Sequence, residues 1–404
     1  MKSVVIASLV AGSLVLSAGM LLRDGSAKEL AGGLGARVFV VERESGSLAI
    51  YDLEQRKLLP RRISGLGNLN HAVMTFSRDL KYGFLATRSG KLSRIDLENM
   101  SAAGEVYTSK NSIDIAVSQD GRFVAAAEYA PGGVTILDAK TLAVRKRLRT
   151  TVTRDGRTID SRATGIVDVP GNRFACVLME GAEVWIIDAS RDDFPVEHRI
   201  PVTRDEPYDA MITPDGRYYV VGHIGSDQVS VIDLSWPQNG AKSVLLRDAG
   251  ELYDRKTPVK LPHLAAWAVA RDKVFVPLVG EARLAILDRW TWQYRGSVPL
   301  RGHPVYAIRS PHEREIWVSF SGEEDDAYLQ AIDTETLEVK RTWRVGARIY
   351  HMDFTPRGSH ALVSANKENK LFLIDTSTYE AVDEEAIDSP SGVFGVWRAF
   401  VIGL

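Results

Sequence analysis

The sequence predicts an all-β protein, an eight-bladed β-propeller that follows an N-terminal signal segment. Three observations predict it: an apolar motif ending in aspartate recurs along the chain, each period holds four short strands, and long helical periodicity is confined to the N-terminus. The chain has 404 residues, 45% hydrophobic and 25% charged, which suits one large repeat domain. A formal net charge of −2 gives no indication of nucleic-acid binding.

The first residues resemble an export signal. Lys2 precedes an uncharged run over residues 3–22, and the small residues Gly25, Ser26 and Ala27 follow where a signal peptidase cleaves. We therefore predict a cleaved signal peptide over 1–27, a propeller over 28–404 and a periplasmic location. An uncleaved membrane anchor is the alternative, because the run is long enough to span a bilayer.

The only cysteine, Cys176, lies far from this segment. A lipid-modified N-terminal cysteine is thereby excluded, as are a disulfide framework, a CxxC metal site and a covalent CxxCH haem.

The repeated motif closes one segment after another, at spacings of 42 to 55 residues, which is near the length of a propeller blade. Its eight copies are AIYD, SRID, TILD, WIID, SVID, AILD, QAID and FLID, ending at Asp52, Asp96, Asp138, Asp188, Asp233, Asp288, Asp333 and Asp375. Aspartate commonly accepts backbone N–H groups in turns. We therefore interpret all eight carboxylates as structural turn residues rather than as a ring of catalytic acids.

Each period begins with an alternating strand such as HAVMTFS (71–77), followed by a polar turn, a more hydrophobic strand, the strand ending in aspartate, and a polar outer strand. The first copy, over residues 37–53, supplies only second and third strands, whereas the C-terminal SGVFGVWRAFVIGL reads as a spare first strand. We expect the C-terminus to complete the first blade and close the ring, which removes the open sheet edge.

In such a ring, the starts of the innermost strands and the turns between second and third strands share one face, around the channel mouth. Residues from distant repeats therefore meet there. They are His71, Asn111, Asp114, Arg162, Tyr208, Asp209, His263, Trp267, His303, Tyr306, Tyr350 and His351 at strand starts, with Arg88, Glu128, Tyr129 and His223 in the turns.

Histidines are concentrated on this rim. The chain has eight, of which four (His71, His263, His303 and His351) lie at or just before an innermost strand and a fifth, His223, lies in a turn of the same face. Imidazole can ligate a transition metal or transfer protons near neutral pH. Arg88 and Arg162 can hold carboxylates, while Tyr129, Tyr208, Trp267 and Tyr350 offer flat apolar faces. This combination suits a planar, acidic ligand such as a metallated tetrapyrrole; a polar rim for a protein partner is the alternative.

Two segments between blades, 144–163 and 244–263, are longer than the others and precede innermost strands. Each is either a solvated charged loop or a lid over an anionic ligand.

The stretches NHAVMTFSRDLKYGFLATRSGKLSRIDL (70–97) and YDAMITPDGRYYVVGHIGSDQVSVIDL (208–234), within the eight-bladed design, resemble the d1-haem propeller of the cytochrome cd1 nitrite reductases of denitrification. The chain is more similar still to NirF-type haem d1 biosynthesis proteins, which use that propeller without a cytochrome c domain. The resemblance covers essentially the whole mature chain.

The resemblance implies roles for particular residues. His71 falls within one position of the reductase's proximal iron ligand, and Arg88 falls on an arginine that contacts haem substituents. One or both of the reductase's distal histidines are replaced, because the corresponding strand starts contain Tyr208–Asp209 and His263–Trp267. Nitrite reduction is therefore not implied.

What the resemblance does imply is non-covalent binding of haem d1 or a late precursor. His71 would be the iron ligand. Arg88, Tyr129, Arg162, His263, Trp267, His303 and His351 would contact the ligand, and Tyr208 with Asp209 would be proton-transfer groups for a tailoring or oxidoreductase-like step. Nitrite reductase and other haem d1 biosynthesis proteins are the implied protein partners, without nucleic acid. Two alternatives stay open: a non-enzymatic scaffold that delivers cofactor to apo nitrite reductase, and a lactonase-like propeller hydrolase.

Overall fold

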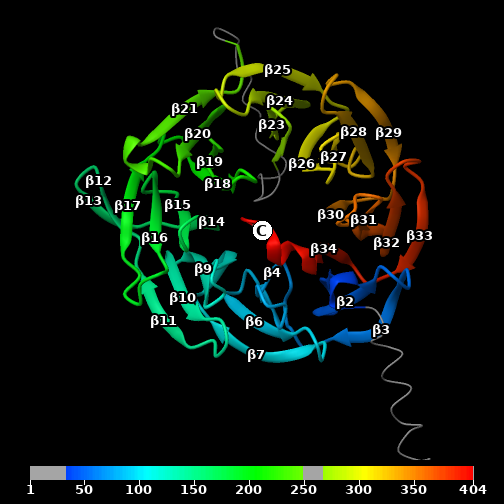
Figure 1. Ribbon diagram of the computed structural model, residues 1–404, viewed down its shortest axis with the longest axis horizontal. Coiled ribbons are helices and arrows are strands. Elements are labelled where there is room, and N and C mark those ends of the chain that lie inside the picture. Colours follow the sequence, from blue (N-terminus) through cyan, green and yellow to red (C-terminus); the bar gives the residue numbers. More distant parts are fainter. Residues whose placement is uncertain (1–32, 249–266, 404) are drawn as a thin grey trace, which may run out of the picture.

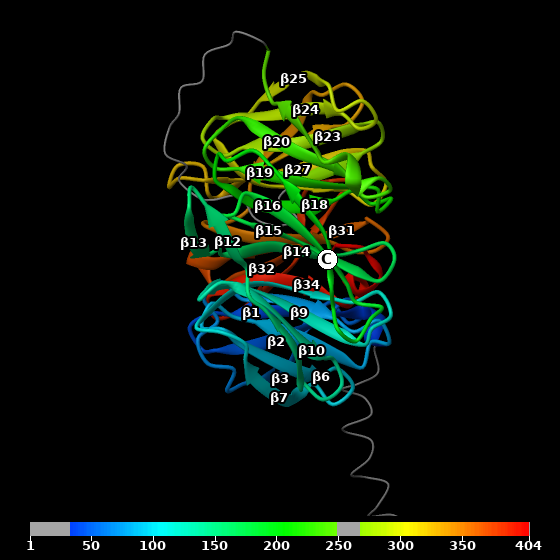
Figure 2. The same ribbon diagram turned by 90° about the vertical axis from the view of Figure 1, so that its left-hand side faces the viewer.

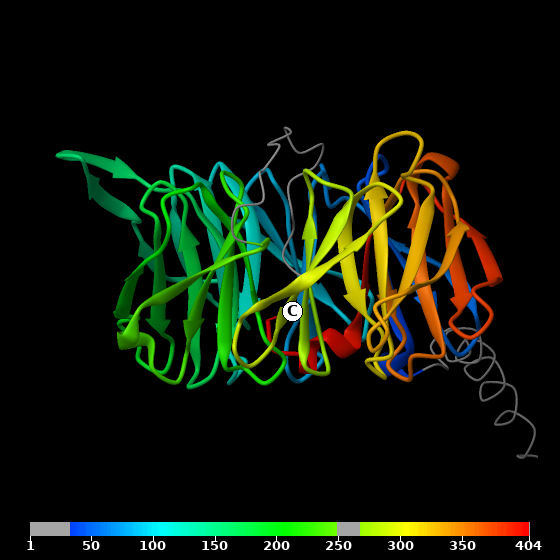
Figure 3. The same ribbon diagram turned by 90° about the horizontal axis from the view of Figure 1, so that it is seen from above.

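The computed structural model describes residues 33–248 and 267–403, and it confirms the eight-bladed β-propeller. Eight four-stranded antiparallel sheets surround a central channel, with the innermost strand of each sheet nearest the axis (Figure 1). Seen from the side, the ring is a flattened disc whose strands run between two faces (Figure 3). The predicted signal peptide over 1–27 lies outside the described residues.

Seven blades follow the order of the chain. In blades 2 to 4 the strands are β4 (Val73–Phe76), β5 (Tyr82–Ala86), β6 (Lys91–Asp96) and β7 (Ser101–Tyr107); β8 (Asn111–Val117), β9 (Phe123–Ala130), β10 (Gly133–Asp138) and β11 (Val144–Leu148); and β14 (Ala163–Val169), β15 (Arg173–Leu178), β16 (Glu183–Asp188) and β17 (Val196–Pro201).

In blades 5 and 6 they are β18 (Pro207–Ile212), β19 (Tyr218–His223), β20 (Gln228–Asp233) and β21 (Ala241–Leu245); and β22 (Ala268–Ala270), β23 (Lys273–Leu278), β24 (Arg283–Asp288) and β25 (Tyr294–Pro299). In blades 7 and 8 they are β26 (His303–Arg309), β27 (Glu315–Ser321), β28 (Tyr328–Asp333) and β29 (Val339–Arg344); and β30 (Ile349–Phe354), β31 (His360–Ala365), β32 (Lys370–Asp375) and β33 (Ala381–Ala386).

Blade 1 joins the two ends of the chain, as predicted. The C-terminal β34 (Pro390–Gly395) is its innermost strand and pairs with β1 (Arg37–Glu42), followed by β2 (Ser47–Asp52) and β3 (Lys57–Ile63). The pairing places Phe394 opposite Phe39. Closure therefore leaves blade 1 without an open inner edge.

Short 3₁₀ helices complete the described elements: η1 (Leu34–Ala36), η2 (Pro237–Asn239), η3 (Asn366–Glu368) and η4 (Val396–Phe400). The last of these directs the C-terminus toward the central channel, at the face opposite the site described below (Figures 1 and 3).

The core consists of apolar clusters packed between neighbouring blades, because the alternating strands bury side chains on both sheet faces. Each of the eight repeated aspartates accepts the backbone N–H of a residue two or three positions further on, at 2.8 to 3.0 Å. These bonds fix the turn that begins each outer strand, which confirms the structural interpretation of the motif.

The long segment after β11 folds into a hairpin of β12 (Thr151–Arg154) and β13 (Arg157–Asp160), which projects from the outside of the ring (Figures 1 and 2). The second long segment lies mostly outside the described residues. Within 33–248 and 267–403, no helix has the length and apolar character needed to cross a membrane.

Candidate functional site

The loops that lead into the innermost strands and the turns between second and third strands form one face of the ring, here called the cavity face. Register shifts interrupt the pairing of the innermost strand near this face in β8, β14, β18, β26 and β30. A β-bulge bends its strand and redirects side chains, and bulges are common beside functional sites. Their recurrence at one level of five blades marks the channel mouth as a specialised region.

A cavity of about 550 Å³, here called the arginine–tyrosine cavity, lies along blades 2 to 5. Four predicted site residues line it: Arg88, Tyr129, Arg162 and Tyr208. The Tyr129 ring lies between two guanidinium groups, with Arg88 at 5.2 Å and Arg162 at 5.5 Å from its centroid. The structure therefore brings these residues together from four consecutive blades, on the face that the sequence predicted.

The two main arginines of this cavity differ in their partners. Arg162 donates its Nε to Glu180 at 2.6 Å and its backbone N–H to the same carboxylate at 2.8 Å. Arg88, in contrast, forms no ion pair within the described parts of the chain. Of the three arginines that line the cavity, Arg162 and Arg204 pair with carboxylates, whereas Arg88 has none within ion-pairing distance among residues 33–248 and 267–403.

The two tyrosines are kept neutral by their surroundings. Burial raises the pKa of Tyr129 to about 12, with further influence from Tyr208, Asp114 and Arg88. Burial, together with the neighbouring Tyr129 and Asp209, raises the pKa of Tyr208 even further. Both phenols therefore keep their protons at neutral pH, and the two hydroxyls interact with each other.

A second opening of about 270 Å³, here called the channel-mouth pocket, contains His71 and His351. Tyr306, Tyr350 and Phe394 give it aromatic walls. The His351 imidazole packs edge-on against Tyr306, with ring centroids 5.4 Å apart, and against Phe394 at 5.3 Å. The pocket thus combines imidazoles with flat apolar surfaces.

His71 adopts a left-handed backbone conformation, with φ of 55°, at the end of the turn before β4. Seventeen other described non-glycine residues share a positive φ, and three of them, Glu206, Arg348 and Ser389, also lie just before innermost strands, so this turn conformation belongs to the repeat. The conformation places His71 at the lip of the channel-mouth pocket rather than in the strand ladder.

His351 is oriented by the backbone of blade 1. Its Nδ1 accepts the N–H of Val393 at 3.3 Å, so in the neutral ring the proton is on Nε2. A ring in this state acts as a hydrogen-bond donor from Nε2 rather than as a metal ligand.

Beneath the two openings, Asp114 and Asp209 form a buried acidic floor. The Asp114 carboxylate accepts the Gly165 N–H at 2.8 Å and the Thr164 hydroxyl at 3.1 Å. Gly165, with φ of +60°, lies so close to β18 that a Cβ would be 3.0 Å from Ala210. Glycine at this position therefore lets three innermost strands converge around the carboxyls.

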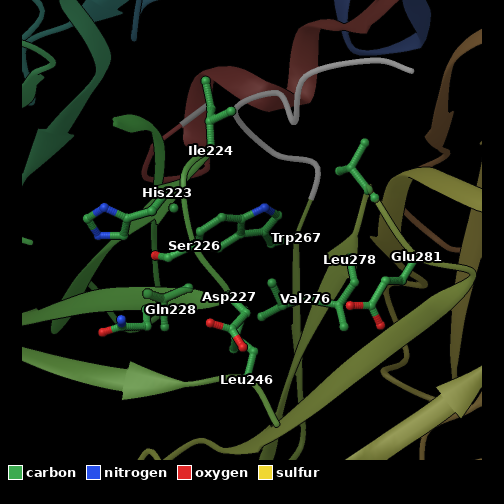
Figure 4. Close-up of a pocket in the computed structure, with 14 residues that line it drawn as sticks. His223, Ile224, Ser226, Asp227, Gln228, Leu246, Trp267, Val276, Leu278 and Glu281 are labelled. Atoms are coloured by element: carbon green, nitrogen blue, oxygen red, sulfur yellow. The ribbon is translucent and has the colours of Figure 1, made fainter. Parts of the chain in front are cut away.

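The other predicted site residues are more dispersed. Figure 4 shows a third pocket, of about 80 Å³, in which the Trp267 indole lies between the His223 imidazole and the Leu278 side chain. Burial lowers the pKa of His223 to about 4, so its imidazole is neutral. The Nδ1 atom of His303 lies 3.1 Å from the Val279 carbonyl oxygen, and this hydrogen bond orients the imidazole. His263 lies outside the described residues.

The sequence prediction missed three arginines on this face: Arg43, Arg348 and Arg398. Arg43 lies in the second-to-third turn of blade 1, where the repeat register places a rim residue, so a signal for it existed. Arg348 directly precedes an innermost strand and had the same signal. Arg398 lines the channel-mouth pocket from η4, which follows the last repeat and carries no repeat pattern.

Comparison with known proteins places this geometry in a family. The family described as "Cytochrome D1 heme domain" matches residues 34–399. The chain is 39% identical to Protein NirF of Pseudomonas aeruginosa over 373 residues, which is 92% of this chain and 94% of that protein.

Two further relatives are dehydrogenases. The chain is 26% identical to the dihydro-heme d1 dehydrogenase of Pseudomonas aeruginosa over 336 residues, which is 81% of this chain and 64% of the dehydrogenase. The solved structure "Dihydro-heme d1 dehydrogenase NirN in complex with DHE" shares the fold, with a TM-score of 0.78 at 22% identity over 91% of this chain and 77% of that one. Because the family match spans the propeller and the identity to NirF extends over nearly the full length of both chains, this protein belongs to the cytochrome d1 haem domain family, as a NirF-type haem d1 biosynthesis protein.

Proposed function

We propose that the protein acts in haem d1 biosynthesis in the periplasm by binding a late tetrapyrrole, haem d1 or its dihydro precursor, across the channel mouth. The observation that carries the proposal is the position of His71, in a left-handed turn at the lip of a pocket with aromatic walls, beside a cavity that presents an unpaired arginine. Family membership supports it, and so does the shared fold of a dihydro-heme d1 dehydrogenase whose solved structure is described as a complex with DHE.

The residues present suit such a substrate. The Asn111 side-chain oxygen is buried and has no hydrogen-bond partner among the described residues. Leaving buried polar groups unpaired is costly, so such groups favour a ligand that satisfies them. The rings of Tyr306, Tyr350 and Phe394 offer the apolar contact that a flat macrocycle requires.

Each predicted residue then has a role. A bound tetrapyrrole would supply an iron that an imidazole nitrogen can ligate, and His71 is the residue proposed to hold it. Arg88 binds a peripheral carboxylate, Arg162 supports the cavity wall through Glu180, and Tyr129 donates a hydrogen bond. Trp267, His303 and His351 are proposed to complete the surrounding contacts, and the predicted contact of His263 lies outside the described residues.

Tyr208 and Asp209 supply protons beneath the substrate. Both are buried, and both have pKa values raised above their ordinary range, chiefly by burial. Burial thus favours the protonated form of both side chains, and these are the groups proposed to exchange protons with the bound tetrapyrrole during a tailoring step.

The test is an absorption titration of the purified exported protein with haem d1. We expect a saturable shift of the Soret and visible bands. The His71→Gly variant, which keeps the left-handed turn because glycine tolerates positive φ, should lose the bands of imidazole coordination. The His312→Ala variant is the matched control, because His312 is exposed and bonds the Arg357 carbonyl on the opposite face. An unshifted wild-type spectrum would overturn the proposal.

A further inference from the structure

The chain continues beyond the strand that closes the ring. Residues 396–403, here called the C-terminal strap, follow β34 and cross the face opposite the cavity face, here called the far face (Figures 1 and 3). Val396 and Ala399 pack in the core between blades 1 and 2, whereas Ile402 packs against the core between blades 4 and 5. Blade 5 lies opposite blade 1 in an eight-bladed ring, so the strap spans the far-face end of the central channel.

Two charged residues fasten the strap to the ring. Arg78, in the turn between β4 and β5, donates one guanidinium N–H to the Ala399 carbonyl and another to the Asp168 carboxylate at 2.8 Å. Asp168 belongs to β14, and its other carboxylate oxygen accepts the Gly403 N–H at 2.9 Å. Arg78 and Asp168 therefore form a clasp that binds each other and holds the strap at two points.

Asp168 departs from the repeat pattern. It pairs with the second residue of the following strand, and the residues in that register of blades 2, 3, 5, 6 and 8 are apolar: Phe76, Val117, Ile212, Val269 and Phe354. The other exception, Arg309 of blade 7, pairs with Glu313 of its own turn.

Burial makes this departure informative. Asp168 is 3% exposed, and burial raises its pKa whereas the charge of Arg78 lowers it. A buried carboxylate is costly unless it is paired and hydrogen-bonded. Because an apolar side chain serves this register in five other blades, the fold itself does not explain the charge. Its bonds to Arg78 and to the strap do.

The strap also reaches the channel-mouth pocket. Its Arg398 lines that pocket, lies 3.7 Å from the Asp353 carboxylate and covers the Phe394 ring at 5.3 Å. Phe394 in turn packs against the His351 imidazole. The same segment that crosses the far face therefore contributes to the wall of a pocket on the cavity face.

We propose that the C-terminal strap is a non-covalent plug, which seals the far-face end of the channel and is fastened by the Arg78–Asp168 clasp. Solvent and ligands then reach the buried Asp114 and Asp209 from the cavity face alone. Releasing the clasp opens the far-face end while β34 stays in its sheet. This device goes beyond the proposed function and does not depend on it.

The first experiment measures how firmly the chain end is held. The full-length exported protein is digested with a carboxypeptidase, and the removal of strap residues is followed by intact mass. The Arg78→Met/Asp168→Val variant replaces the clasp by apolar residues, a change that buried ion pairs often tolerate without loss of the fold. We expect its strap to be trimmed at least about tenfold faster than that of the wild type, because digestion follows the population of the open form.

The matched control is Arg271→Gln/Glu335→Gln. It removes another ion pair of the far face, 3.1 Å long, which joins blades 6 and 7 away from the strap. Its strap should be trimmed at the wild-type rate. A wild-type strap that is trimmed as fast as that of the clasp variant would overturn the clasp.

The second experiment tests the seal with the clasp residues intact. Gly403 has a φ of +77°, and a Cβ there would collide with Ile212, so Gly403→Val displaces the end of the strap. The innermost strands β14 and β18 pair on one side only, so N–H groups on their channel side are protected by exclusion of water. Hydrogen exchange is measured by mass spectrometry on overlapping peptides.

We expect both variants to speed exchange at the far-face ends of β14 and β18 by about tenfold, with the outer strand β29 unchanged. If these ends exchange at wild-type rates in both variants, the strap does not seal the channel. No tetrapyrrole is added in either experiment, so their failure leaves the proposed function standing.

Discussion

The side chains of Asp114 and Asp209 are buried neighbours beneath the channel mouth. Burial raises the pKa of Asp209 well above its ordinary value, and the charge of Asp114 raises it further. Burial also raises the pKa of Asp114, but its charged form is stabilised by the Gly165 N–H, the Thr164 hydroxyl and the charge of Arg88. Asp209 has only the adjacent Ala210 N–H as a donor. Of the two carboxyls, Asp209 is therefore the one that retains its proton.

This difference predicts a pH dependence of stability. In the unfolded chain Asp209 ionises near 3.8, whereas the folded protein keeps it protonated to higher pH. The native state then binds more protons, so stability falls as pH rises through this interval. Asp209→Asn removes the effect. Measured by calorimetry, the Tm of this variant minus the Tm of the wild type should increase as the pH is raised from about 5 to about 8.

The control is Asp288→Asn. Backbone N–H groups lower the pKa of Asp288, so its contribution is lost only at acid pH. Its Tm difference from the wild type should be constant over the same range. A constant difference for Asp209→Asn would contradict the assignment of the proton.

The two histidines of the channel-mouth pocket should differ in function. His351 accepts the Val393 N–H at Nδ1, which keeps its proton on Nε2, whereas His71 occupies the strained turn at the lip. We expect His351→Ala to keep the absorption bands of the coordinated iron while weakening affinity, and His71→Gly to lose those bands. The reverse pattern would assign the iron to His351.

The paired and unpaired arginines of the arginine–tyrosine cavity should contribute unequally to binding. Arg88→Gln removes a guanidinium free to bind the ligand, and affinity for haem d1 should fall about tenfold. Arg162→Gln removes one already bound to Glu180, whose pKa is lowered because hydrogen bonds from Arg162 outweigh the effect of burial. The affinity of the Arg162→Gln variant for haem d1 should change by less than about threefold. A larger effect of Arg162→Gln, measured by the same titration, would show that the Glu180 pair opens on binding.

Ring closure predicts a difference between two phenylalanines of the C-terminal segment. Phe394 is 3% exposed and packs in the core between blades 1 and 2, whereas Phe400 is 67% exposed. Phe394→Ala should lower the free energy of unfolding by about 3–5 kcal/mol, whereas Phe400→Ala should change it by less than about 0.5 kcal/mol. Chemical denaturation of both variants measures this, and equal effects would argue against closure by β34.

The sequence by itself determined the number of blades, their closure by the C-terminal strand and the turn role of the repeated aspartates. These properties depend on local alternation and on a fixed period, which are visible along the chain. The same register correctly brought Arg88, Tyr129, Arg162 and Tyr208 to one cavity.

Only the tertiary structure decided which of these groups are already engaged. Ring closure and strand irregularity set the distances between these residues. Examples are the bulges that direct Asp114 and Tyr306, the Glu180 partner of Arg162 and the Val393 contact of His351. A sequence pattern records which face a residue occupies, but not the distance to a residue of another blade. For that reason the sequence could not show that Arg162 is engaged by Glu180 whereas Arg88 forms no ion pair with the described residues.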